Sequence, residues 1–122
     1  MRLLLDTHTF IWWDNARLPK RVTTQIQRAD EVYVSAVTAW EIAIKTALGK
    51  LSARGTVADA IDDYGFTRLP VTVEHADAVA GLPAHHRDPF DRLLVVQTRI
   101  EELTLVTRDP TFGPYGVSVL WA

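Results

Sequence analysis

The sequence predicts an α/β domain in which a central parallel sheet of about five short strands is covered by helices on both faces. Runs rich in Val and Leu alternate with helical patterns along the chain, and this alternation is typical of parallel sheets. A length of 122 residues with 48% hydrophobic content suits one domain with its own core. Because no repeat, low-complexity tract or linker divides the chain, we expect a single domain over residues 1–122.

Short apolar runs and helical periodicity give the order of the elements. The expected strands are residues 2–6, 31–35, 66–69, 103–107 and 117–120. The expected helices are residues 7–13, 20–29, 36–48, 57–64, 73–81 and 89–102. Gly49 follows the third helix and Pro89 opens the last one, which are the usual stop and start signals.

The composition limits the class of protein. The chain has no cysteine, so it relies on neither disulfides nor thiolate-bound zinc, and this fits a reducing compartment. Its first apolar stretch is broken by Asp6 after three leucines, which is far too short for an export signal or a membrane span. We therefore expect a cytoplasmic protein with no membrane association. The net charge of −2 does not indicate a general polyanion binder, although acids gathered in one cleft can dominate such a total.

Four acidic residues stand at the edges of predicted buried structure. Asp6 and Asp109 follow strand-like runs, while Glu41 and Asp91 interrupt apolar helical segments. In α/β sheets the functional groups gather at the carboxyl ends of the strands. We therefore expect these four carboxylates to converge on one acidic pocket that binds metal.

Capping offers a purely structural explanation for several acids. Asp6 precedes a helix and Asp109 precedes Pro110, so both suit capping positions. Asp88 is the clearest cap, since Pro89 directly follows it. Asp91 would lie in the first turn of the same helix, where the helix dipole favours a carboxylate.

Capping does not explain Glu41. It is the only charge in residues 36–44, and helical spacing places it between Val37 and Ile44 on one stripe. A surface pair with Lys45 four residues on is worth only about 0.2–0.5 kcal/mol, too little to hold a desolvated charge. Metal ligation is favoured, and intrahelical pairing with Lys45 stays open as the alternative.

Four motifs make the chain resemble a known family over its full length: LLLDTHTFIWW, VSAVTAWEIAIKTALGKL, HRDPFDRLLVVQT and LTLVTRDPTF. They resemble PIN-domain proteins, and most of all the VapC-type toxins of bacterial and archaeal toxin–antitoxin pairs. The resemblance implies a PIN-like three-layer α/β/α fold and a small ribonuclease. The acids that match the family's metal-binding positions are Asp6, Glu41, Asp91 and Asp109, with Thr107 at the small hydroxyl position. The same pattern selects Asp91 rather than Asp88.

The resemblance also implies a chemistry and partners. Oxygen ligands without thiols suit Mg²⁺, with Mn²⁺ as its substitute, better than zinc, and either one or two ions are possible. A metal-activated water would hydrolyse the RNA phosphodiester, leaving a 3′ hydroxyl and a 5′ phosphate. The expected partners are the RNA substrate, a cognate antitoxin protein and a second copy in a homodimer. The alternative is a catalytically silent PIN-like module that binds RNA or a partner.

Two other enzyme classes fit less well. Histidines could serve as acid and base in a metal-free nuclease, but His85 and His86 lie in a polar, loop-like segment and are expected to be solvated. A haloacid-dehalogenase-like phosphatase needs a D-x-D-x-T signature, and here His8 occupies the second acidic place.

Substrate contacts are less well defined by the sequence. The cations near the acidic motifs are Lys45, Lys50, Arg54, Arg87, Arg92 and Arg108. Trp12 or Trp13 could stack on RNA bases, although a core or interface role is favoured for tryptophans in apolar helices. Trp40 is expected to be buried with its helix. These residues do not specify which RNA is cut.

Overall fold

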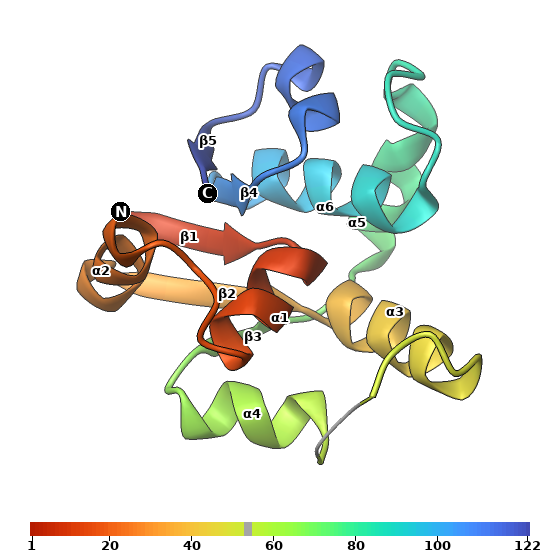
Figure 1. The fold of residues 1–122 in the computed structure, drawn as a ribbon. Coiled ribbons are helices and arrows are strands. Elements are labelled where there is room, and N and C mark those ends of the chain that lie inside the picture. The colour runs from red at the N-terminus through yellow and green to blue at the C-terminus, as the bar shows by residue number, and fades with distance from the viewer. Residues whose placement is uncertain (53–54) are drawn as a thin grey trace.

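The computed structural model describes residues 1–52 and 55–122 and is built around a five-stranded sheet whose neighbouring strands are all parallel (Figure 1). The strands are β1 (Arg2–Leu5), β2 (Glu31–Ser35), β3 (Thr67–Leu69), β4 (Thr104–Thr107) and β5 (Val119–Trp121), in the order β3-β2-β1-β4-β5. The predicted α/β class and parallel sheet are confirmed. The last strand begins at Val119, two residues later than predicted.

The helices are α1 (Thr7–Asp14), α2 (Lys20–Arg28), α3 (Ala36–Ala47), α4 (Val57–Asp63), α5 (Val73–Ala78) and α6 (Pro89–Ile100). The helix predicted over residues 73–81 is divided, because α5 passes into a 3₁₀ turn, η1 (Val79–Gly81). A second 3₁₀ segment, η2 (Pro110–Tyr115), was not predicted. Gly49 follows α3 with a φ of +74°, a backbone conformation that favours glycine. Within the described residues, no helix is both long enough and apolar enough to span a bilayer.

The sheet is buried on both faces, which explains its continuous apolar strands. Along β1, Leu4 packs into one cluster with Leu94 and Leu105, whereas Leu3 and Leu5 belong to a cluster on the other face. Residues of α6 fill the first cluster, and residues of α1, α2 and α4 contribute to the second. In Figure 1, α5 and α6 lie on one side of the sheet and α4 on the other. The predicted three-layer arrangement is therefore confirmed.

The strand order determines where a site can form. From β1 the chain proceeds to β2 and β3 on one side and then returns to β4 on the other side of β1. The switch in direction lies between β1 and β4, where α/β sheets open a crevice at the carboxyl ends of the strands. The Asp6 amide still donates to the Val106 carbonyl at 3.1 Å, so the two strands remain paired up to this edge.

Candidate metal centre

Asp6 lies at the end of β1 and is only 4% exposed. Its Oδ1 accepts from the Thr9 amide at 2.8 Å, so the predicted capping role is confirmed. Its Oδ2 accepts from the Thr107 hydroxyl at 2.6 Å. Each oxygen therefore has one protein donor that fixes the carboxylate at the sheet edge, and each retains a second lone pair for another ligand.

Glu41 lies on the inner face of α3 and is 3% exposed. Its Oε2 accepts from Lys45 Nζ at 2.8 Å, so the intrahelical pair considered from the sequence is present. Its Oε1 is also buried and has no hydrogen-bond partner among the described residues. A buried carboxylate oxygen without a partner is costly, and a bound cation would offset that cost.

Asp88 is the N-cap of α6, as predicted. Its Oδ1 accepts from the Phe90 amide at 2.8 Å and from the Asp91 amide at 3.3 Å. Through these bonds the carboxylate stabilises the start of the helix. The cap also fixes the first turn of α6, from which Asp91 projects.

Asp91 has the most strongly perturbed environment of the acids. Its side chain is 18% exposed. Burial, followed by the negative charges of Asp88, Glu41, Asp6 and Asp109 in that order, raises its pKa to about 8. Three of the acids predicted to converge, Asp6, Glu41 and Asp109, therefore act electrostatically on the fourth, Asp91.

Asp109 caps η2, where its Oδ1 accepts from the Thr111 amide at 2.9 Å. Its own amide donates to the Thr107 hydroxyl at 3.0 Å. Partial burial raises the pKa of Asp109, but hydrogen bonds from Thr111 and His86 outweigh this effect and hold the pKa below its usual value. Asp109 is therefore ionised while Asp91 resists ionisation.

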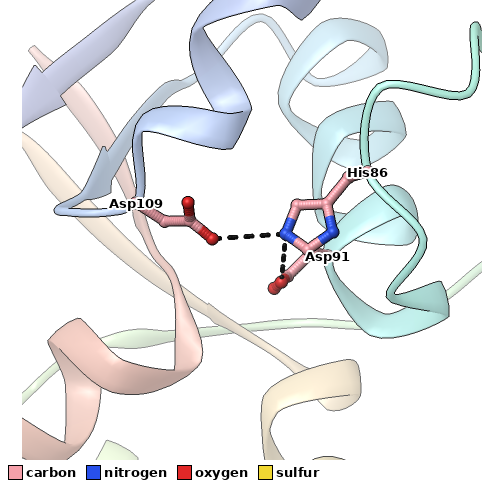
Figure 2. Close-up of side chains that lie close together, drawn as sticks. All are labelled: His86, Asp91 and Asp109. Atoms are coloured by element: carbon pink, nitrogen blue, oxygen red, sulfur yellow. Dashed lines mark hydrogen bonds and ion pairs between the residues drawn. The ribbon is translucent and has the colours of Figure 1, made fainter.

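His86 lies between two of these acids, and its expected solvation was wrong (Figure 2). Its side chain is 15% exposed, and Nε2 lies 2.9 Å from Asp91 Oδ2 and 3.2 Å from Asp109 Oδ2. The Asp88 amide donates to Nδ1 at 3.2 Å, so the ring proton lies on Nε2 and points at both carboxylates. The signal in the sequence was its place in the same short motif as Asp88 and Asp91.

The backbone and ring of His86 are also fixed. Its amide donates to the Tyr115 hydroxyl at 2.8 Å, and its ring centroid lies 5.6 Å from that of Phe112. Both aromatic residues belong to η2, which the sequence did not predict. This segment therefore brings His86 to the acids.

The donor set fits a divalent cation. Among the described residues, one group of possible ligand atoms lies mutually within 4.8 Å, from His86, Asp91 and Asp109. Because the proton of His86 occupies Nε2, the two carboxylates are the atoms of this group available to a cation. Asp6 and Glu41 lie outside that group, although both charges act on Asp91. Hard carboxylate oxygens suit Mg²⁺ or Mn²⁺. The partnerless Glu41 oxygen and the raised pKa of Asp91 are both features that a cation would relieve.

A cavity of about 320 Å³ opens beside the acids. It is lined by Asp6, His8, Trp12, Arg108 and Asp109. The Arg108 guanidinium carbon lies 4.1 Å from the Trp12 ring centroid. The acidic site is therefore bordered by an aromatic and cationic surface.

The other tryptophans lie elsewhere. Trp13 contacts Tyr64 edge-on at 5.8 Å between ring centroids and also packs near Phe66. Trp40 is 60% exposed, so its predicted burial was wrong. It lies off the buried stripe of α3 and packs edge-on against Phe90, with ring centroids 5.1 Å apart.

Comparison with known proteins identifies similar folds. A family model described as PIN domain matches residues 3–116. The crystal structure of VapBC2 from Rickettsia felis bound to a promoter DNA fragment contains a chain 13% identical to this one, with a TM-score of 0.74 over 98% of each chain. FitAcB from Neisseria gonorrhoeae gives a TM-score of 0.70 at 21% identity, over 97% of this chain and 96% of that one. A toxin–antitoxin complex from Klebsiella pneumoniae gives a TM-score of 0.68 at 13% identity, over 97% of this chain and 95% of that one. No curated protein sequence matched.

Proposed function

Because this chain belongs to the PIN-domain family, we propose that it is a metal-dependent endoribonuclease and the toxin of a toxin–antitoxin pair. The observation that carries the proposal is the environment of Asp91, a largely buried carboxyl whose pKa is raised to about 8 by burial and by four neighbouring carboxylates. Strongly perturbed acids in a cleft at a sheet edge are typical of functional sites. In this proposal residues 1–122 act as one PIN domain in the cytoplasm.

The proposed ligands are the four predicted acids. Asp6, Glu41, Asp91 and Asp109 would hold Mg²⁺, with Mn²⁺ as a substitute. The fit rests on the oxygen-rich donor set and on Glu41 Oε1, which is buried and has no partner among the described residues. A divalent ion, when bound, supplies Lewis acidity toward water and toward the phosphate oxygens.

The proposed reaction is hydrolysis of an RNA phosphodiester. Water adds to phosphorus and the bond from phosphorus to the 3′ oxygen breaks. The 3′ oxygen takes up a proton, so the products carry a 3′ hydroxyl and a 5′ phosphate. The 2′ hydroxyl takes no part as a nucleophile, so no cyclic phosphate is expected.

Neighbouring residues of this chain hold the acids in place. The Thr107 hydroxyl donates to Asp6 and accepts from the Asp109 amide, at 2.6 and 3.0 Å. The N–H of His86 points at Asp91 and Asp109. Groups that orient metal ligands are part of the working site, because their removal typically costs metal affinity or activity.

The proposed partners are a cognate antitoxin protein and a second copy of this chain. The similar Klebsiella pneumoniae structure is a toxin–antitoxin complex, which supports the first. Trp40 of α3 and Leu48, which directly follows α3, are 60% and 64% exposed and offer apolar surface for a partner chain.

A cleavage assay tests the proposal. The purified chain should cut single-stranded RNA with Mg²⁺ or Mn²⁺ and stop when a chelator is added, and the new ends should be 5′ phosphates. Asp6→Asn, Glu41→Gln, Asp91→Asn and Asp109→Asn should each abolish cleavage with folding intact by circular dichroism. Glu74→Gln removes an exposed carboxylate on α5 and should cut at the wild-type rate. Metal-independent binding without cleavage would favour the silent PIN-like module instead.

A further inference from the structure

The cavity beside the acids combines three kinds of side chain. Asp6 and Asp109 are acidic, Trp12 and His8 are aromatic, and Arg108 is cationic. The Trp12 ring is half-buried on α1, and the His8 ring lies 5.8 Å from it at a tilt of 37°. The aromatic surface is therefore continuous with the edge of the acidic site.

Trp12 and its neighbour Trp13 have different surroundings. Trp13 is packed against Tyr64 and Phe66, and it does not line this cavity. Trp12 lines the cavity together with Asp6 and Asp109. Of the two tryptophans that the sequence offered for stacking, only Trp12 is placed beside the acids.

The candidate cations also differ in the contacts that they make. Lys45 is paired with Glu41. The Arg92 guanidinium donates to main-chain carbonyl oxygens, including that of Pro83 at 2.9 Å, so it serves the fold. Arg54 lies outside the described residues. Arg108 is exposed, lines the cavity, and forms no ion pair with any residue in the described part of the chain.

We infer that this cavity is a nucleotide subsite, in which Arg108, whose guanidinium lies over the Trp12 ring, turns to an adjacent phosphate and leaves that ring to stack on an RNA base. The inference rests on the proposed ribonuclease function and extends it to how the substrate is held. Single-stranded RNA is commonly bound by stacking unpaired bases on aromatic rings and on arginine planes. The cavity volume of about 320 Å³ is in the range of small-molecule sites.

The charges explain why both residues are needed. Two carboxylates in the wall would repel a phosphate, and Arg108 is the cation beside them. A base on Trp12 adds an attraction that does not depend on salt, whereas the contact from Arg108 to phosphate does. The two contributions can therefore be measured separately.

Binding of two labelled probes tests the subsite. The probes are hexauridylate and an abasic hexamer with the same phosphates, measured by fluorescence anisotropy with Mg²⁺ in a Glu41→Gln background that blocks cleavage. Trp12→Ala should weaken hexauridylate binding about 10-fold and leave the abasic probe unchanged, because the removed ring contacts only the base. Trp12→Phe should retain most of the affinity. Arg108→Gln should weaken both probes and reduce the salt dependence by about one phosphate contact.

Matched controls use residues outside the cavity. Trp13→Phe and Arg68→Gln should leave both affinities unchanged, since Trp13 packs on Tyr64 and Arg68 pairs with Asp62. The inference is overturned if Trp12→Ala binds hexauridylate as tightly as the parent, or loses the abasic probe equally. An arginine-containing peptide is measured as a third probe. The inference is also overturned if Trp12→Ala weakens binding of this peptide alone, which would assign the cavity to a protein partner.

Failure of the subsite and failure of the proposed function give different results. If the wild-type chain cuts RNA and Trp12→Ala keeps its KM, only the subsite is wrong. If the wild-type chain neither binds nor cuts RNA with Mg²⁺, the ribonuclease proposal itself is wrong.

Discussion

The Thr107 hydroxyl donates a hydrogen bond of 2.6 Å to Asp6 Oδ2 and so joins residues 101 positions apart at the carboxyl ends of β4 and β1. The same hydroxyl oxygen accepts from the Asp109 amide at 3.0 Å. Thr107 is fully buried, so water does not substitute for either contact. One hydroxyl thus fixes two of the proposed metal ligands relative to each other.

Thr107→Val should weaken metal binding about 10-fold, because it removes the hydroxyl while keeping the shape of the side chain. The protein should also lose about 1–3 kcal/mol of stability from the unpaired polar groups. Titration calorimetry with Mn²⁺ measures the first effect and thermal unfolding the second. Thr107→Ser should restore metal affinity.

Thr98→Val is the matched control, since its hydroxyl is buried and donates to the Leu94 carbonyl at 2.8 Å, away from the acids. It should lose stability and keep metal affinity. Equal loss of metal affinity in both variants would show that the effect of Thr107 is general destabilisation.

Substitutions of Asp88 and of Asp91 should have different effects on the cleavage rate. Asn is a good N-cap, so Asp88→Asn should keep the fold and most of the cleavage rate. Asp91→Asn should abolish cleavage, because it removes the carboxylate on which the other acids act. Cleavage rates of the two variants provide the comparison. An inactive Asp88→Asn beside a fully active Asp91→Asn would reverse the assignment within this motif.

The sequence predicts the carboxyl ends of β1 and β4 to within one residue, because each apolar run stops at a polar residue. Asp6 and Asp109 were found in that way, and both line one cavity because β1 and β4 are neighbours. Glu41 stood out because an isolated charge in an apolar helix requires a partner. In each case a local pattern carried the information.

His86 and Trp40 could not be placed from local patterns. The position of His86 depends on Tyr115 and Phe112 of η2, which follow it by more than 20 residues in the sequence. The apolar run around Trp40 made its side of α3 ambiguous, because Ala, Val and Ile occupy several faces. Contacts distant in sequence, rather than helix propensity, determine both positions.

The metal-free protein should lose stability as the pH rises toward 8. The pKa of Asp91 is about 8 in the folded state against an ordinary value of 3.8, so the folded state binds this proton more tightly than the unfolded state. The stability from the protonated carboxyl is complete below about pH 4 and is lost as the pH rises to about 8. Mg²⁺ should restore it, because the ion binds only the folded state.

Asp91→Asn isolates this effect, since Asn does not titrate. Its melting temperature without metal should exceed that of the wild type by about 5 °C or more at pH 8.5, with a smaller difference at pH 5. Mg²⁺ should raise the wild-type value and leave the variant nearly unchanged. A difference between the two proteins that is independent of pH would count against ionisation of Asp91 as the cause.

Expression of this chain alone should arrest growth, and co-expression of the protein encoded beside its gene should relieve the arrest by direct binding. The physical reason is that an acidic site which opens beside a solvent-facing cavity is accessible to RNA unless another chain covers it. Growth curves after induction of the wild type and of Glu41→Gln, with and without the neighbouring gene, measure both effects. Glu41→Gln should be harmless because the buried carboxylate is lost while the surface for a partner is kept. Equal toxicity of both forms would indicate binding or aggregation rather than cleavage, and an absence of toxicity despite good soluble expression would contradict the toxin role while leaving a PIN nuclease intact.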